Sequence, residues 1–102
     1  MQLIKTLRAD FDAPDARFVL ATLGQTNKDN PQGTEKDIIE AMFAVSDPEK
    51  HPEFSGDVAT VYTHPLSKGG GSSGHYGNNA ETYMNVGLGM GEAMVELLKA
   101  DN

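Results

Sequence analysis

The three histidines of this 102-residue sequence are its side chains best suited to proton transfer or metal binding. His51, His64 and His75 show neither H-x-x-x-H nor H-E-x-x-H spacing, so no predicted helix presents two of them on one face. Each falls on a separate predicted loop. His51 is most simply a surface residue, and His64 either lies near a site or is merely exposed. We therefore expect no metal and no other cofactor.

His75 differs from the other two in its position. It follows a Gly/Ser-rich stretch, Ser67 to Gly74, that comes after a predicted strand and precedes a predicted helix. Chemistry in open α/β sheets gathers at the carboxyl ends of strands. An imidazole, whose ordinary pKa lies near neutrality, suits a general base there. A loop histidine is more often a surface residue without a functional role than a catalytic one, so its position alone leaves both a catalytic and a non-catalytic His75 open.

The last predicted helix contains three glycines, Gly87, Gly89 and Gly91. Their spacing does not fit the G-x-G-x-x-G phosphate loop, and no strand leads directly into them. Each costs about 1 kcal/mol relative to alanine inside a helix, so packing should compensate. We expect Gly87 and Gly91 on the buried face, where they would allow close contact with a sheet.

The same helix should begin at Asn79 as its N-cap, with Glu81 in the first turn favoured by the helix dipole. The methionines and Tyr83 could suggest a cofactor box, but core packing is favoured, with Met84 partly exposed. The residues expected to line its buried face are Tyr83, Gly87, Met90, Gly91, Met94 and Leu98.

Upstream elements must position these residues. Helical spacing of Leu3, Ile4, Leu7 and Phe11 predicts a first helix. The apolar run 18–23 predicts a strand buried on both faces, and residues 58–63 predict a second strand. Between them, a capping box at Thr34 and Asp37 predicts a helix start.

The order helix, strand, helix, strand, helix favours parallel strands joined through a helical crossover. The run 18–23 resembles a central strand, which needs a neighbour on each side, and this sequence supplies only one. Either the protein oligomerises, or the missing strands are encoded upstream of Met1.

Composition excludes several kinds of site. Eight basic residues face fifteen acidic ones, a net charge of -7, which argues against nucleic acid and against an anionic membrane surface as partners. No apolar run approaches the ~20 residues that span a bilayer. The sequence has no cysteine, which excludes disulfides and thiolate chemistry. The first residues show no signal-peptide layout.

The segment HYGNNAETYMNVG (75–87), continued by GEAMVELL (91–98), resembles the C-terminal region of sialate O-acetylesterase-like carbohydrate esterases of the SGNH-hydrolase superfamily. The similarity covers nearly the whole sequence, and its most specific part is HYxxNAETY. Supporting similarity lies in residues 3–8, 13–22, 47–50 and 52–54.

The resemblance implies hydrolysis of acetyl or related acyl esters on sugars. It implies a flavodoxin-like α/β/α sandwich, of which residues 1–102 form the C-terminal portion of one domain with part of the three layers. His75 maps onto the histidine that takes the proton from a serine nucleophile and returns it to the leaving sugar hydroxyl. The substrate would be an acylated carbohydrate, and the parent protein would be exported, as its relatives often are.

Two departures limit that resemblance. The G-Q-S-like nucleophile turn and the oxyanion-hole residues are absent, so the isolated sequence is expected to be inactive. Many relatives place aspartate three residues before the histidine, whereas Ser72 stands here. Gln25, Asn27 and Tyr76 are candidate sugar contacts, because they lie on loops at the same predicted edge. The alternative is a complete, non-catalytic binding or assembly module that completes its sheet as a homodimer.

Overall fold

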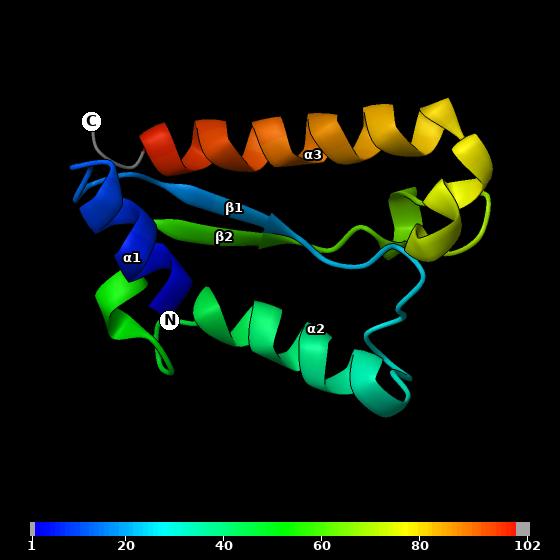
Figure 1. The fold of residues 1–102 in the computed structure, drawn as a ribbon, viewed down its shortest axis with the longest axis horizontal. Helices are drawn as coiled ribbons and strands as arrows, with labels where there is room; N and C mark the ends of the chain where they lie inside the picture. Colours follow the sequence, from blue (N-terminus) through cyan, green and yellow to red (C-terminus); the bar gives the residue numbers. More distant parts are fainter. Residues whose placement is uncertain (1, 100–102) are drawn as a thin grey trace.

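Two parallel strands run through the centre of the computed structural model, which describes residues 2–99 (Figure 1). β1 (Phe18–Ala21) and β2 (Val58–Val61) pair in register, from Phe18 opposite Val58 to Ala21 opposite Val61. Parallel strands need a crossover of a dozen or more residues, and α2 (Gly33–Val45) lies in it. The predicted strand–helix–strand unit and its parallel direction are confirmed.

The remaining elements complete the predicted order. α1 (Gln2–Asp10) precedes β1, and α3 (Ala80–Lys99) ends the described chain. Three short segments lie between them: the 3-10 helices η1 (Pro52–Phe54) and η2 (His64–Leu66), and η3 (Ser72–Asn78), whose backbone is not helical from Gly74 to Gly77.

Both strands end two residues earlier than predicted, because threonine side chains replace the backbone ladder at their carboxyl ends. The Thr63 backbone N–H donates to Thr22 Oγ1 at 3.0 Å, and Thr63 Oγ1 donates to the Thr22 carbonyl at 2.7 Å. Both threonines are buried, so these bonds satisfy polar groups that would otherwise be costly. They also hold the two following loops together.

Helices cover both faces of the strand pair, α3 on one and α2 on the other (Figure 1). Successive side chains of a strand point to opposite faces. Phe18 and Leu20 accordingly pack against the main apolar cluster, which consists of Ile4, Val45, Phe54 and Val58.

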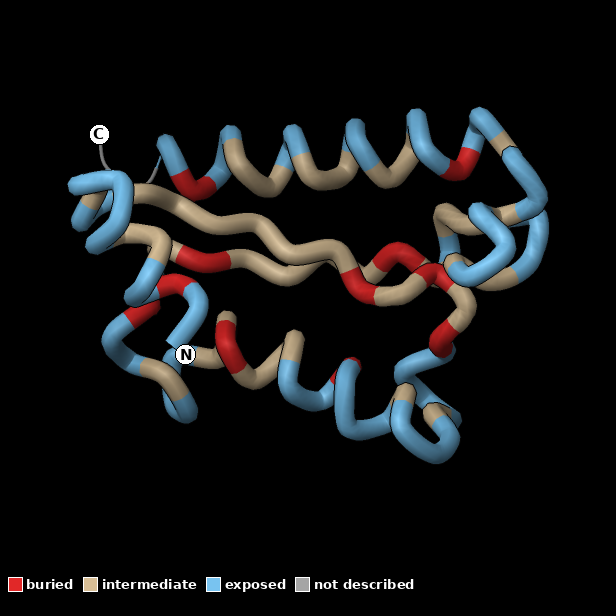
Figure 2. The backbone as a smooth tube through the Cα atoms, viewed as in Figure 1, coloured by how far each residue is buried: buried red, intermediate tan, exposed pale blue. Residues whose placement is uncertain are grey.

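β1 is less buried than its apolar sequence predicts. All four of its residues are only half-buried, whereas Val58 of β2 is buried (Figure 2). The prediction of a strand buried on both faces is therefore wrong for this chain. The cause is the size of the sheet: with two strands, both are edge strands, and three of the four β2 residues are half-buried as well.

The backbone pattern of β1 shows the same open edge. At one end of the strand pair, the Phe18 N–H donates to the Asp57 carbonyl. At the other end, the Thr22 N–H donates to the Val61 carbonyl. Successive backbone N–H groups of a strand point to opposite sides, so the N–H groups of Val19 and Ala21 point away from β2. Within residues 2–99 neither of these two N–H groups has a hydrogen-bond partner.

The two predicted helix starts have different outcomes. Asn79 caps α3 as predicted, because its Oδ1 accepts from the Thr82 backbone N–H at 2.9 Å. The capping box at Thr34 and Asp37 is wrong. α2 begins at Gly33, so its N-cap is Gln32, two residues before Thr34, and Gln32 makes no side-chain capping bond.

The predicted buried face of α3 is also wrong. Thr82 and Leu97 are buried, Met90 and Met94 are half-buried, and the other four predicted residues (Tyr83, Gly87, Gly91 and Leu98) are exposed. The glycine that faces the sheet is Gly89, where an added Cβ would lie 3.4 Å from Val61 Cγ1. The predicted exposure of Met84 is confirmed.

Candidate functional site

The loops that follow β1 and β2 meet at the carboxyl ends of the strands, the edge where α/β folds bind ligands. One loop is residues 22–32. The other, residues 62–79, contains η2 and η3, and η3 lies beyond the ends of both strands (Figure 1). We call this region the carboxyl edge.

His75 stands in a backbone turn of unusual handedness. The φ angles of His75, Tyr76, Gly77 and Asn78 are 53°, 51°, 60° and 59°, all in the left-handed region. That region costs a non-glycine residue about 1–3 kcal/mol, and the surrounding structure must hold it. Four successive residues, three of them not glycine, therefore form a strained segment, and strained segments are common at functional sites. We call residues 75–78 the left-handed turn.

The Gly/Ser-rich stretch before this turn packs closely against it. A Cβ on Gly69, whose φ is 92°, would overlap the carbonyl oxygen of Tyr76. A Cβ on Gly24 would lie 2.7 Å from Tyr76 Cε1 and would also collide with Ser67. Glycine is thus required at both positions, because three segments approach one another at the carboxyl edge.

Two predicted site residues tie the left-handed turn to the loop after β1. The Tyr76 hydroxyl accepts from the Gly24 backbone N–H at 3.1 Å. Gln25 Oε1 accepts from the Ser72 backbone N–H at 3.1 Å, and its Nε2 donates to Glu35 Oε1 at 3.4 Å. The segment carrying His75 is therefore held on both sides, at Ser72 and at Tyr76.

Asn27 lies in a different part of the same edge. Its Oδ1 accepts from the Asp29 backbone N–H at 2.9 Å and from the Tyr62 hydroxyl at 3.5 Å. Within residues 2–99 it makes no hydrogen bond to the left-handed turn. The structure thus brings Gln25 and Tyr76 to the His75 segment and leaves Asn27 beside Tyr62; a role for any of them in sugar binding stays a prediction.

The His75 side chain is exposed, and within the described chain it makes no hydrogen bond or ion pair. Ser72, three residues before His75, donates its backbone N–H to Gln25, and within the described chain it makes no contact to the imidazole. The structure therefore positions the His75 backbone and leaves its ring free to meet another group.

His64 is the residue at this edge that sequence reasoning left undecided. Its Nδ1 lies 2.8 Å from the Gly24 carbonyl oxygen. A carbonyl only accepts, so Nδ1 carries the hydrogen and neutral His64 has its lone pair on Nε2. The ring is half-buried and lies beside Tyr62, with centroids 6.1 Å apart. Its place directly after β2 was the signal that could have selected it.

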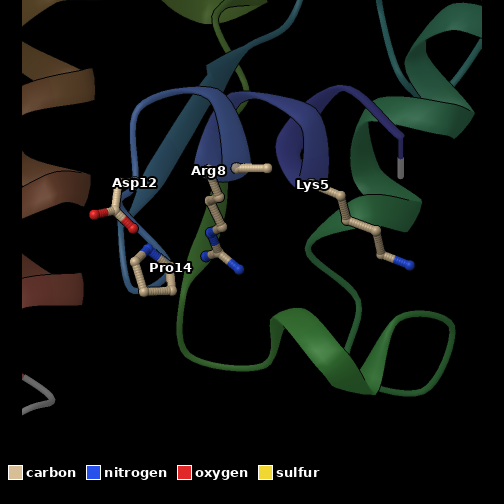
Figure 3. Close-up of a pocket in the computed structure, with 5 residues that line it drawn as sticks. Lys5, Arg8, Asp12 and Pro14 are labelled. Atoms are coloured by element: carbon tan, nitrogen blue, oxygen red, sulfur yellow. The ribbon is translucent and has the colours of Figure 1, made fainter.

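A hollow lies at the other end of the strands. A pocket of about 360 Å³ is lined by Lys5, Arg8, Ala9, Asp12 and Pro14 (Figure 3). Arg8 is committed to the fold, because its Nη2 donates to the Ala16 carbonyl at 2.7 Å and its guanidinium lies over the rings of Phe18 and Phe54. The pocket belongs to α1 and the turn after it, not to the carboxyl edge.

Residues 2–99 contain no group of three or more His, Asp or Glu side chains placed to hold a metal ion. No helix in this range combines the length and the apolar composition needed to cross a bilayer.

Comparison with known proteins gives no family assignment. No protein-family model matches the sequence, and no curated protein or solved structure is significantly similar to it.

Proposed function

We propose that this chain is the C-terminal part of a carbohydrate ester hydrolase, in which His75 is the general base. The observation that carries the proposal is the left-handed turn, which holds His75 in a strained backbone conformation at the carboxyl edge. The similarity of residues 75–87 to carbohydrate esterases of the SGNH-hydrolase superfamily supports the same assignment. The half-buried β1 supports a larger, three-layer α/β/α domain with further strands.

The reaction follows from the chemistry of an imidazole beside a hydroxyl nucleophile. His75 takes the proton of a serine supplied by another part of the protein as that oxygen attacks the acyl carbonyl. The protonated imidazole then gives the proton to the departing sugar oxygen. Water repeats the sequence on the acyl-serine and releases the carboxylic acid. Backbone N–H donors from the same missing part would stabilise the oxyanion.

The proposal predicts that the 102-residue chain alone does not hydrolyse an aryl acetate, because it lacks the serine turn and the oxyanion donors. In the complete protein encoded at the same locus, His75→Ala should lower kcat by about 10³-fold or more with little change in folding. His51→Ala is the matched control and should retain activity, since His51 pairs with Glu53 and stacks on Phe54 in a separate loop.

Two results would overturn the proposal. One is full activity of the complete protein after His75→Ala. The other is a stop codon directly upstream of Met1, with no coding sequence for a G-Q-S-type turn before it.

A further inference from the structure

The side of α3 that faces away from the strands is apolar. Met84, Leu88, Val95 and Leu98 are 74%, 64%, 48% and 52% exposed there. With Gly91 they recur at steps of four, three, four and three residues, the spacing that forms one straight seam along a helix. We call these five residues the outer stripe. The charged residues of this helix, Glu81, Glu92, Glu96 and Lys99, fall to one side of the outer stripe, so the stripe itself is an exposed apolar surface.

We propose that the outer stripe binds the outer stripe of a second copy of this chain, with the two helices antiparallel. The glycines give the first reason. Gly87 and Gly91 face outward, and an added Cβ at either would meet nothing within 4 Å. Glycine weakens a helix, and nothing in residues 2–99 uses these two for close packing. A second helix crossing at Gly91 would use the absence of a side chain to approach the backbone closely.

The exposed area gives the second reason. The outer stripe with the adjoining ring of Tyr83 spans about 21 Å of helix, at 1.5 Å per residue. Pairing two such stripes would bury roughly 1,000 Å² in total, the lower limit for a specific protein interface. The area therefore fits a weak dimer of two equal surfaces, with Kd on the order of 10–100 µM.

Charge selects the antiparallel direction. Glu81 and Lys99 are both exposed and stand at opposite ends of α3, where within one chain they form surface ion pairs with Lys68 and Glu96. Antiparallel pairing centred on Gly91 brings Lys99 of one copy near Glu81 of the other, which parallel pairing does not, although it also brings the two copies of Glu92 near each other. Opposed helix dipoles favour the same direction. Because each chain carries a net charge of -7, added salt should strengthen the dimer by screening repulsion.

Sedimentation velocity at protein concentrations between about 1 and 500 µM tests the association, because this range brackets the Kd expected for an interface of this size. We expect reversible dimerisation that Leu88→Glu with Val95→Glu weakens at least about tenfold, since each charge would be buried in the seam. Phe11→Glu is the control. Phe11 is 76% exposed and lies outside α3, so dimerisation should be unchanged. Circular dichroism checks that each variant is folded.

Single cysteines test the geometry, because the sequence contains none. Under mild oxidation Gly91→Cys should form disulfide-linked dimers quickly, while Met84→Cys and Leu98→Cys each should do so slowly. A monomer at every concentration overturns the proposal. A dimer that is unaffected by Leu88→Glu with Val95→Glu also overturns it, and pairing through the β1 edge would give that result. Equal cross-linking at all three positions overturns it as well. None of these outcomes bears on ester hydrolysis, which the His75 variant tests separately.

Discussion

The hydroxyl of Tyr76 illustrates how single atoms hold the carboxyl edge together. It accepts the Gly24 N–H at 3.1 Å, and the ring packs edge-on against Tyr83 with centroids 5.7 Å apart. The bond crosses from the left-handed turn to the loop after β1. Since backbone N–H groups in packed regions are costly when unpaired, this one contact opposes the tendency of the turn to relax.

Tyr76→Phe should therefore lower the free energy of unfolding by about 1–2 kcal/mol, because it removes the acceptor and leaves the Gly24 N–H without a partner. Urea denaturation measures the difference. Tyr83→Phe is the matched control: it keeps the ring pair and removes a hydroxyl that makes no hydrogen bond in the described chain. A loss of equal size in both variants would contradict the role given to the Tyr76 hydroxyl.

At the scale of elements, α3 separates what sequence predicts from what only tertiary structure decides. Its start follows from Asn79, because a cap is a contact between residues three apart. Its buried face does not follow. Apolar residues and glycine surround most of the helix, so hydrophobic spacing alone fits more than one face. The outward face, with Leu88 and Leu98, has the more regular apolar spacing.

The site shows the same division. The order of the elements and the place of His75 on the loop after β2 follow from local sequence patterns, and both predictions are confirmed. The bond from His64 to Gly24 joins residues forty positions apart, and no local pattern encodes it. The left-handed turn could not be foreseen either, since three of its four residues are not glycine.

The helix glycines allow a paired prediction. Gly89→Leu should destabilise the protein by about 1–3 kcal/mol, because even its Cβ would contact Val61 and the rest of the side chain would enter the packed interface. Gly87→Ala should stabilise it by up to about 1 kcal/mol, through helix propensity alone. Thermal unfolding at low micromolar concentration compares the two, and the opposite order would place α3 in another rotation on the sheet.

For the molecule as a whole, charge and edge exposure act together. Fifteen acidic residues and eight basic ones leave the chain self-repelling at neutral pH. The same chain leaves β1 at an open edge, with apolar side chains only half-buried. Charge repulsion therefore acts on a chain whose first strand is only half-buried.

Added sodium chloride should accordingly raise the thermal midpoint at pH 7, by a few degrees, as screening weakens the repulsion. Calorimetry at low protein concentration, where association is negligible, measures the shift. The same salt series near pH 4.7, the isoelectric point, is the control and should show little change. An equal rise at both pH values would attribute the effect to salt acting on apolar surface instead.

The open edge of β1 also makes this strand a reporter of its own surroundings. Its amide protons should exchange with solvent deuterium in alternation: slowly at Phe18, Leu20 and Thr22, which face β2, and quickly at Val19 and Ala21, which do not. In a longer protein that supplies a neighbouring strand, the two fast amides should become as slow as the others. The exchange rates of the Val19 and Ala21 amide protons would then show whether a further strand pairs with the free edge of β1.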